Sequence, residues 1–148
     1  MLSLKILGTP ESKQSARFRA IKTGDGKSFI QSYQSKKVKD NERNIKFDVK
    51  KQLPEGFMPY DMAIGCKVLF VFPPLKSWSK KKIAELDSGI TIHKDTKPDL
   101  TDNLMKGLFD AMQGIIFTDD SRVCKVESSK IYGIIPRIEV YIYPLIEL

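Results

Sequence analysis

Residues 63–72 read AIGCKVLFVF, the most apolar run of the chain, and this run decides the fold class. The run is much shorter than the ~20 residues of a membrane-spanning helix, and the pair Pro73-Pro74 ends it. A short apolar run that is bounded in this way is typical of a buried strand. We therefore expect residues 63–72 to form the central strand of a sheet.

Elements on both sides of this strand supply the rest of the fold. Residues 35–53 place apolar side chains at helical spacing, which predicts a helix that packs on the sheet and ends at Pro54. A hairpin is predicted around Gly24-Asp25-Gly26. Alternation predicts strands at residues 2–7, 122–132 and 137–143, the last two antiparallel around residues 133–136. The predicted fold is α+β: a single domain, residues 1–148, with one mixed, mainly antiparallel sheet and flanking helices.

Five aspartates gather in residues 97–120, KPDLTDNLMKGLFDAMQGIIFTDD. From Asp102 onward apolar residues recur at helical spacing as far as Gly114, which predicts a short helix with Asp102 at or near its N-cap. Residues 115–117 then predict a short strand that delivers Asp119 and Asp120. Because such dense carboxylates repel one another, we expect the helix start and the strand end to meet at a divalent cation.

This acidic block resembles the signature of the RusA-type Holliday-junction resolvases, in which K-P-D-x-D-N-L-x-K is followed by D-A-(L/M) and a D-D pair. Here the signature reads Lys97-Pro98-Asp99, Asp102-Asn103-Leu104, Lys106, Asp110-Ala111-Met112 and Asp119-Asp120. Two upstream stretches also resemble runs of phage-type members, namely residues 74–82 (PLKSWSKKK) and Gly8-Thr9-Pro10 with Lys13 and Arg17. The resemblance spans most of the chain and implies a RusA-like fold.

One spacing departs from the family pattern. The family's first two aspartates are normally two residues apart, whereas Leu100 and Thr101 separate Asp99 from Asp102 here. In an extended segment, strict alternation would turn the two side chains to opposite faces. We expect a bulge to absorb the extra residue, which would restore the convergence of the two carboxylates.

The resemblance implies a crossover junction endodeoxyribonuclease that uses Mg²⁺ and resolves Holliday junctions by paired nicks in DNA strands. Metal-binding residues would be Asp99, Asp102 and Asp120, and Lys106 would assist at the transition state or the leaving oxygen. Asp119, Asn103 and Asp110 would support the site from outside the ligand set, with structural hydrogen bonding as the alternative for Asn103 and Asp110. The implied assembly is a homodimer, which is known of the family and suits two nicks in a four-way junction.

Basic residues upstream of the acidic block are candidates for binding this branched DNA. The resemblance favours phosphate contacts for Lys13 and Arg17, and Arg19 lies in the same basic segment. Ser77 or Ser79 is expected to cap a short helix whose first turn holds Lys80, Lys81 and Lys82. Cations are unfavourable at a helix N-terminus, and a bound phosphate would offset that cost. Trp78 beside them either stacks on an unpaired base or is buried.

The charge of the 148 residues is unevenly distributed. The formal net charge is +7, but residues 1–98 hold 20 Lys and Arg against 10 Asp and Glu, and residues 99–148 hold 5 against 8. A basic body with an acidic focus suits an enzyme that binds a polyanion and hydrolyses it at a metal. Two alternatives remain: a structure-selective DNA-binding protein that has lost its metal site, and a basic RNA-associated protein whose acidic block is only a capped helix and a turn.

The two cysteines and the single histidine limit other chemistries. Cys66 and Cys124 lie far apart in apolar surroundings, so we expect reduced core residues rather than a disulfide or zinc ligands. His93 alone cannot complete a zinc site, and a catalytic role for it is the less favoured interpretation. Without a membrane span or a signal-peptide pattern, the sequence predicts a cytoplasmic protein. The resemblance to phage-type members places it in a bacterial or phage-infected cell.

Overall fold

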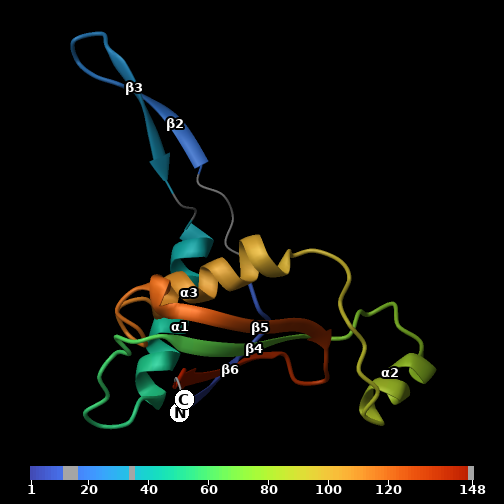
Figure 1. Cartoon of the computed structure of the whole chain (residues 1–148). Coiled ribbons are helices and arrows are strands. Elements are labelled where there is room, and N and C mark those ends of the chain that lie inside the picture. The colour runs from blue at the N-terminus through green and yellow to red at the C-terminus, as the bar shows by residue number, and fades with distance from the viewer. Residues whose placement is uncertain (12–16, 34–35, 147–148) are drawn as a thin grey trace.

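The computed structural model describes residues 1–11, 17–33 and 36–146, and of Arg17 and Tyr33 it describes the backbone alone. Four strands form the main sheet: β1 (Leu2–Leu7), β4 (Ile64–Phe72), β5 (Val123–Tyr132) and β6 (Arg137–Pro144). Their order across the sheet is β1-β6-β4-β5 (Figure 1). β6 pairs antiparallel with β1 and with β4, whereas β4 and β5 run parallel. The predicted α+β class with a mixed, mainly antiparallel sheet is confirmed.

The apolar β4 occupies the interior of the sheet, as its sequence predicts. It has β6 on one side and β5 on the other. Ile64, Val68 and Phe70 are at most 2% exposed. Removing each such side chain from water contributes roughly 1.5–3 kcal/mol to folding. The most apolar run of the chain therefore forms the middle of the core.

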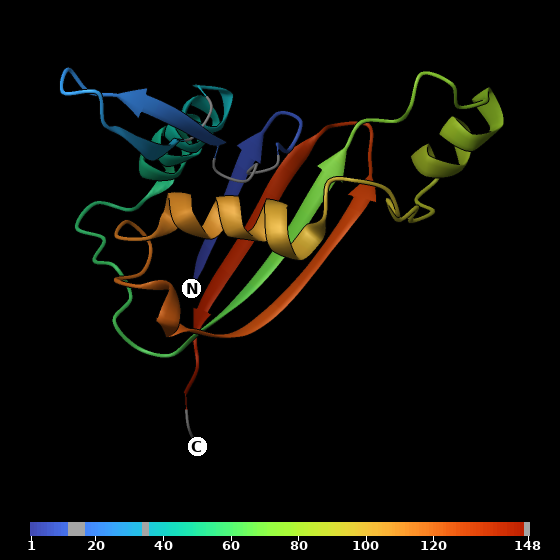
Figure 2. The ribbon, with the colours of Figure 1, turned by 90° about the horizontal axis from the view of Figure 1, so that it is seen from above.

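Two helices cover one face of the sheet. α3 (Lys106–Met112) lies across the strands in Figure 2, and π-helical residues Leu100–Met105 (η1) precede it. α1 (Lys36–Gln52) packs beside β1 and against α3. The apolar stripe predicted for α1 is confirmed, because Val38, Ile45 and Val49 are buried. The helices and the sheet thus enclose one core between them.

A shorter helix, α2 (Lys80–Asp87), lies at the far end of β4 in Figure 1. Ser79 is its N-cap, since the side-chain oxygen accepts a hydrogen bond from the backbone N–H of Lys82 at 3.2 Å. Of the two cap residues that the sequence offers, Ser79 is therefore the one used. Among the described residues, no helix has both the length and the apolar character that crossing a membrane requires.

β5 and β6 are strands at the predicted positions, but they are not neighbours. The sequence predicts an antiparallel pair around residues 133–136, whereas β4 lies between the two strands. The reason is their different apolar content. β6 buries Ile138, Val140 and Ile142, while residues 124–127 of β5 are exposed. An interior place in the sheet suits β6, and an edge suits the more polar β5.

Residues 115–117 form a turn rather than the predicted strand. Gly114, with φ of 79°, begins the turn after α3, and Ile116 and Phe117 are fully buried. The backbone N–H of Tyr60 donates to the carbonyl of Ile116 at 2.8 Å, and Thr118 donates back to Tyr60 at 3.0 Å. The run is apolar because it fills the core below α3, and its short length allows only isolated bridges.

The predicted hairpin is confirmed as β2 (Arg17–Lys22) and β3 (Ser28–Tyr33), which project from the body in Figure 1. Asp25 holds the turn by accepting hydrogen bonds from the Thr23 hydroxyl and from the backbone N–H of Lys27. These bonds lower the pKa of the Asp25 carboxyl. An extended hairpin of this kind presents its side chains to whatever binds beside it.

The two cysteines differ from each other. Both are free thiols. Cys66 is buried in the core as expected, and burial raises its pKa to about 12. The expected core position of Cys124 is wrong, because this cysteine is exposed on β5. Its sequence context includes apolar residues, but β5 is the outer strand of the sheet, and the side chain of Cys124 is exposed there.

Candidate active site

The acidic block opens a helix whose N-cap is Asp99 rather than Asp102. Asp102 lies in the first turn. The backbone N–H of Leu104 donates to the carbonyl of Asp99 at 3.1 Å, a bond that spans five residues. Such a π-type turn holds one residue more than an α-helical turn and is often found at functional sites. The expectation of a β-bulge is therefore wrong. The extra residue between Asp99 and Asp102 is accommodated in a helical turn and not in an extended segment.

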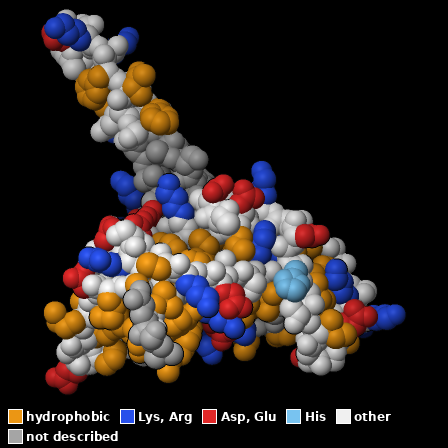
Figure 3. Space-filling view, viewed as in Figure 1, with side chains coloured by type: hydrophobic (Ala, Val, Ile, Leu, Met, Phe, Trp, Pro, Cys, Tyr) orange, Lys and Arg blue, Asp and Glu red, His pale blue; other side chains and the backbone are white. Residues whose placement is uncertain are grey.

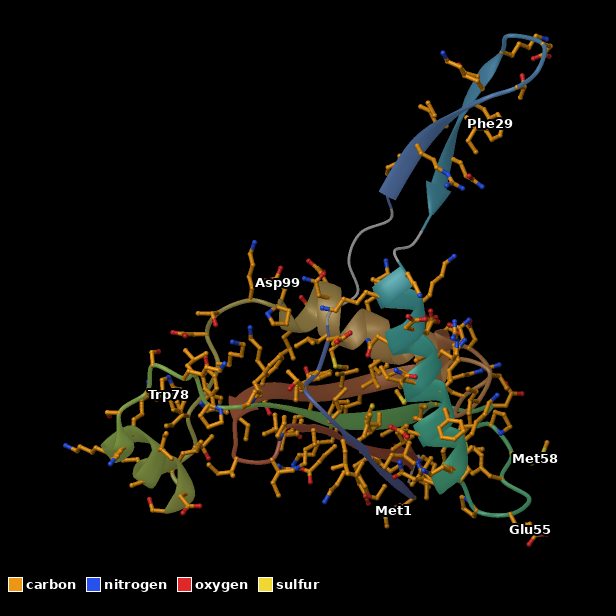
Figure 4. All side chains as sticks on the ribbon, turned by 180° about the vertical axis from the view of Figure 1, so that it is seen from behind. Met1, Phe29, Glu55, Met58, Trp78 and Asp99 are labelled. Carbon is orange, nitrogen blue, oxygen red and sulfur yellow. The ribbon has the colours of Figure 1, made fainter. Side chains whose placement is uncertain are left out.

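Three charged side chains stand along the start of this helix. Asp99, Asp102 and Lys106 are exposed and follow one another at spacings of three and four residues. Residues at these spacings are neighbours on a helix surface. Figure 4 shows Asp99 on the upper surface of the body, on the side from which the hairpin projects. The start of the acidic block thus forms a compact, solvent-facing group of two carboxylates and one ammonium.

Lys130 of β5 fixes the chain at this point. Its Nζ donates to the carbonyl of Pro98 at 2.8 Å and also to the carbonyl of Thr96. The ammonium is therefore engaged with the loop that leads into Asp99. The sequence does not indicate this role, because Lys130 is 32 residues from Pro98 and belongs to no motif of the block.

A pocket adjoins the same helix start. It is lined by Asn103, which is half-buried, by Lys97 of the segment before Asp99, and by residues of the loop after β1 and of α1, among them Glu11 and Lys37. Lysines beside a pair of carboxylates can bind phosphate groups that approach the carboxylates. Lys37 belongs to α1, far from the acidic block in the sequence, so its place beside the block becomes visible only in the fold. Asp110, also half-buried, lies two turns beyond Asp102 in α3.

The second aspartate pair lies at the start of β5. Asp119 is the N-cap of a 3-10 turn, η2 (Asp120–Arg122), and accepts a hydrogen bond from the backbone N–H of Ser121 at 3.2 Å. Hydrogen bonding to Ser121 lowers the pKa of this carboxyl. Asp120 is exposed. Of the pair, Asp119 is thus engaged in local structure, and Asp120 presents its carboxylate to solvent.

A further acid that the sequence did not single out lies at this end. Asp61 accepts a hydrogen bond from the Thr118 hydroxyl at 2.8 Å and forms an ion pair with Arg122 at 2.9 Å. Asp61 lies in the loop before β4 and belongs to no sequence motif. Its contacts hold the segment after α3 to the start of β4, which fixes where Asp120 lies.

The two groups of aspartates lie at opposite ends of β5. Asp120 precedes Val123, where β5 begins, whereas Lys130 holds the loop before Asp99 near the other end of the strand. Seven residues of strand span roughly 23 Å. Among the described residues, no three carboxylate, imidazole or thiol groups lie close enough to hold a metal together. The expectation that the helix start and Asp120 meet at one point within the chain is therefore wrong.

The physical reason for this separation is the path of the chain. Residues 100–112 form the crossover that returns from the end of β4 to the start of its parallel neighbour β5 (Figure 2). A helix in such a crossover runs the length of the sheet. Residues that flank it in the sequence must then lie at opposite ends.

The predicted nucleic-acid contacts fall on two separate elements. Lys80, Lys81 and Lys82 are exposed on α2. Trp78 is half-buried: its ring stands edge to face against Tyr132, with centroids 4.6 Å apart, and the Nζ of Lys82 lies 4.2 Å from its centroid. Figure 4 shows Trp78 where α2 joins the body. Of the two roles open for Trp78, these contacts favour anchoring α2.

The hairpin carries the remaining predicted contacts. Arg19 is exposed, and its Nε donates to the side-chain oxygen of Gln31 at 3.0 Å. Phe18 and Ile30 are 69% and 76% exposed, and Figure 3 shows apolar side chains along the hairpin with cations near its tip. Lys13 lies outside the described residues, as does the side chain of Arg17. Cations next to exposed apolar groups are suited to nucleic acid.

The arrangement of these residues can be compared with that of a known protein family. The model of the family "Endodeoxyribonuclease RusA" matches residues 8–143. The chain belongs to the RusA family. The family match covers both aspartate groups, as well as the hairpin and α2. The RusA resemblance drawn from the acidic block is thereby confirmed.

One curated relative is similar to this RusA chain. It is the "Uncharacterized protein YqaN" of Bacillus subtilis strain 168, which is 38% identical over 89 residues. The aligned part covers 60% of this chain and 61% of the relative. The name of this relative states no activity, so the proposed function rests on the family match.

Proposed function

We propose that this chain is a Mg²⁺-dependent endonuclease that cuts four-way DNA junctions by paired nicks. The observation that supports this most is the start of the acidic-block helix, where Asp99, Asp102 and Lys106 are exposed side by side in a chain of the RusA family. Phosphodiester hydrolysis needs an activated water and neutralisation of the charge that develops on the phosphate oxygens. Carboxylates that hold a metal, with a lysine beside them, are suited to both tasks.

Asp99 and Asp102 fit a magnesium ion that is shared with DNA. Mg²⁺ is usually bound by one or two carboxylates and takes its other ligands from water and substrate phosphates. The side chain of Asp99 makes no capping hydrogen bond to its own helix, and both carboxylates are exposed. When bound, Mg²⁺ neutralises charge on the scissile phosphate and lowers the pKa of the attacking water.

The chain's own cations would bind and orient the DNA strand. Lys106 follows Asp102 by one turn, so its ammonium can approach the phosphate oxygens or the leaving oxygen. Lys37 and Lys97 line the adjoining pocket and would take a neighbouring phosphate. These residues would fix the strand beside the two carboxylates.

We further propose a homodimer. A four-way junction must be nicked in two strands of like polarity, and two sites related by a two-fold axis match that geometry. The third proposed ligand, Asp120, lies too far along β5 to join Asp99 within one chain. A complete three-carboxylate site therefore needs a contribution from a second chain.

Cleavage of a synthetic four-way junction tests the proposed function. We expect the purified protein to cut it with Mg²⁺ and only to bind it with EDTA. A DNA-binding protein without catalysis would shift the junction in a gel under both conditions and cut it in neither. An RNA-associated protein would bind double-stranded RNA as tightly as the junction. Either of these outcomes would contradict the proposal.

The lysines of α2 give a test of DNA binding. Neutralising Lys80 and Lys81 together by alanine should weaken junction binding at every sequence and lower the slope of log affinity against log salt by about 1.8, because each phosphate contact contributes about 0.9. Gel shifts at several salt concentrations measure the slope. The matched control is Lys50→Ala with Lys51→Ala, in the last turn of α1. Equal slopes for both pairs would exclude α2 from the interface.

A further inference from the structure

The hairpin of β2 and β3 is open to solvent on both of its faces, since none of the side chains of residues 18–32 is buried. Successive residues of a strand alternate between the two faces. The register of the strands places Phe18 and Ile30 on one face. Ile21 and Phe29 lie on the other. Because exposed apolar groups that gather in one place mark interaction sites, the hairpin offers two candidate binding faces.

One of these faces holds the hairpin together. Ile21 and Phe29 stand directly opposite each other, and an aromatic residue opposite a β-branched one is a favourable cross-strand pair. In the neighbouring pair, the Nε of Arg19 donates to the side-chain oxygen of Gln31 at 3.0 Å. Within residues 18–32, Ile21 and Gln31 are the half-buried side chains. The side chains of this face thus have partners within the hairpin.

The opposite face, which we call the Phe18 face, consists of Phe18, Ala20 and Ile30. Phe18 and Ile30 are 69% and 76% exposed. The residues directly across the strands from them, Ser32 and Ala20, are small. An aromatic ring next to an aliphatic side chain presents an apolar surface on which a nucleic acid base can stack. The Phe18 face is therefore the more open of the two faces and has the chemistry of a stacking platform.

The charge of the hairpin selects nucleic acid as the occupant of this face. Residues 17–33 hold one acid, Asp25, against four cations: Arg17, Arg19, Lys22 and Lys27. The carboxylate of Asp25 is engaged in the turn with the Thr23 hydroxyl and the backbone N–H of Lys27. A hairpin of this charge attracts a polyanion. It would repel the same hairpin of a second copy, which carries the same positive charge.

The position of the hairpin favours DNA that is bound at the acidic block. Glu11, which precedes the hairpin, and Lys37, which follows it in α1, line one pocket together with Lys97 and Asn103 of the acidic block. Figure 4 shows the hairpin projecting from the side of the body that carries Asp99. A strand of six residues is roughly 20 Å long. DNA at the start of the acidic-block helix therefore also lies within reach of the hairpin.

We propose that the Phe18 face inserts at the branch point of a DNA junction and stacks on the base pairs that end there. This inference rests on the proposed function. Apolar side chains that enter between base pairs must unstack them. In a continuous duplex that cost is met in full, whereas at a branch point the stacking of the arms is already interrupted. Insertion of Phe18 and Ile30 thus selects junctions over uninterrupted duplex.

A four-way junction with 2-aminopurine at the branch point tests the insertion. The base fluoresces more strongly when it is not stacked between neighbouring bases. The measurement is made in EDTA, so that it depends on neither Mg²⁺ nor cleavage. Binding of the wild-type protein should raise the fluorescence of this junction. The same probe in the middle of an arm should not respond.

The variant Phe18→Thr with Ile30→Thr removes the Phe18 face and keeps strand-forming residues. It should give no rise in fluorescence. It should also bind the junction at least about fivefold more weakly, since stacking of one base on an aromatic side chain is worth that factor or more. Binding to a duplex of the same length should be unchanged, because the cations of the hairpin remain.

The other face of the hairpin supplies the matched control. Ile21→Thr with Phe29→Thr again replaces one isoleucine and one phenylalanine, and a pair of threonines is also favourable across two strands. This variant should keep both the rise in fluorescence and the affinity for the junction. Loss of the rise in both double variants would overturn the proposal. So would wild-type junction binding by Phe18→Thr with Ile30→Thr, which would mean that the Phe18 face serves a membrane or a protein partner.

Two single substitutions give a second measurement should the double variants fold poorly. Phe18→Tyr and Phe18→Ile both keep a strong strand former at this position. Phe18→Tyr also keeps the aromatic ring and should retain the rise in fluorescence, whereas Phe18→Ile should lose most of it. An equal rise in both variants, or in neither, overturns the proposal.

Failure of the insertion and failure of the proposed function can be told apart. A protein that cuts the junction with Mg²⁺ but gives no rise in fluorescence would retain the function and lose the insertion. A protein that gives the rise but does not cut the junction would retain the insertion and lose the function.

Discussion

Replacing Asp120 by Asn is expected to slow Mg²⁺-dependent junction cleavage by about 10²-fold or more, the cost of removing one group that stabilises charge in a transition state. The substitution keeps the size of the side chain and removes its charge. Junction binding should be unchanged or tighter, since a carboxylate beside DNA repels phosphates. Single-turnover cleavage of a labelled junction measures the first effect, and gel shifts in EDTA measure the second.

The neighbouring aspartate provides the control. Asp119 caps η2 through its bond to the backbone of Ser121, and Asn is as good an N-cap as Asp. Asp119→Asn should therefore keep the turn and should lower the cleavage rate far less than Asp120→Asn does. If the protein were an RNA-associated protein without a metal site, Asp120→Asn would change stability alone. Full cleavage by Asp120→Asn would remove this residue from the site.

Local periodicity was sufficient to predict most elements of the fold. β1, β4, the hairpin and α1 lie where alternation, apolar content and helical spacing place them. Ser79 was one of two expected caps, because a serine side chain can accept from the N–H groups at a helix start. In each case the information lies within a few residues, since the hydrogen bonds and the buried face of one element are set by its own sequence.

The order of the strands could not be predicted in the same way. β4 lies between β5 and β6 because of burial that only the assembled sheet defines. Residues 115–117 also looked like a strand, although Ile116 and Phe117 are apolar because they fill the core from a turn. A short apolar run does not reveal whether its partner is a strand or the interior of the fold.

The candidate site shows the same limit. The family pattern identified the aspartates and Lys106, and the altered spacing between Asp99 and Asp102 was visible in the sequence. The extra residue is accommodated in a π-type turn, which is defined by the hydrogen bond from the N–H of Leu104 to the carbonyl of Asp99. That Asp120 lies at the other end of β5 depends on the crossover helix between two parallel strands. Neither the turn nor the crossover can be recognised from the alternation or the helical spacing of apolar residues in the sequence.

The second large effect is expected in dimers of two different mutant chains. One chain carries Asp102→Asn and the other Asp120→Asn, each with its own affinity tag, so that two successive purifications yield the mixed dimer. Dimers of either single chain should be inactive, because both of their sites lack a ligand. The mixed dimer should contain one intact site, built from Asp99 and Asp102 of one chain and Asp120 of the other. It should nick one strand at about half the wild-type rate.

The reciprocal pairing tests most directly whether each site is built from two chains. A wild-type chain is combined with a chain that carries both Asp102→Asn and Asp120→Asn, and the tagged mixed dimer is assayed on the same junction. A shared site predicts no cleavage, because each of the two sites then lacks one ligand. Cleavage at about half the wild-type rate would mean that the wild-type chain acts alone, and it would contradict the proposal that each site is built from two chains.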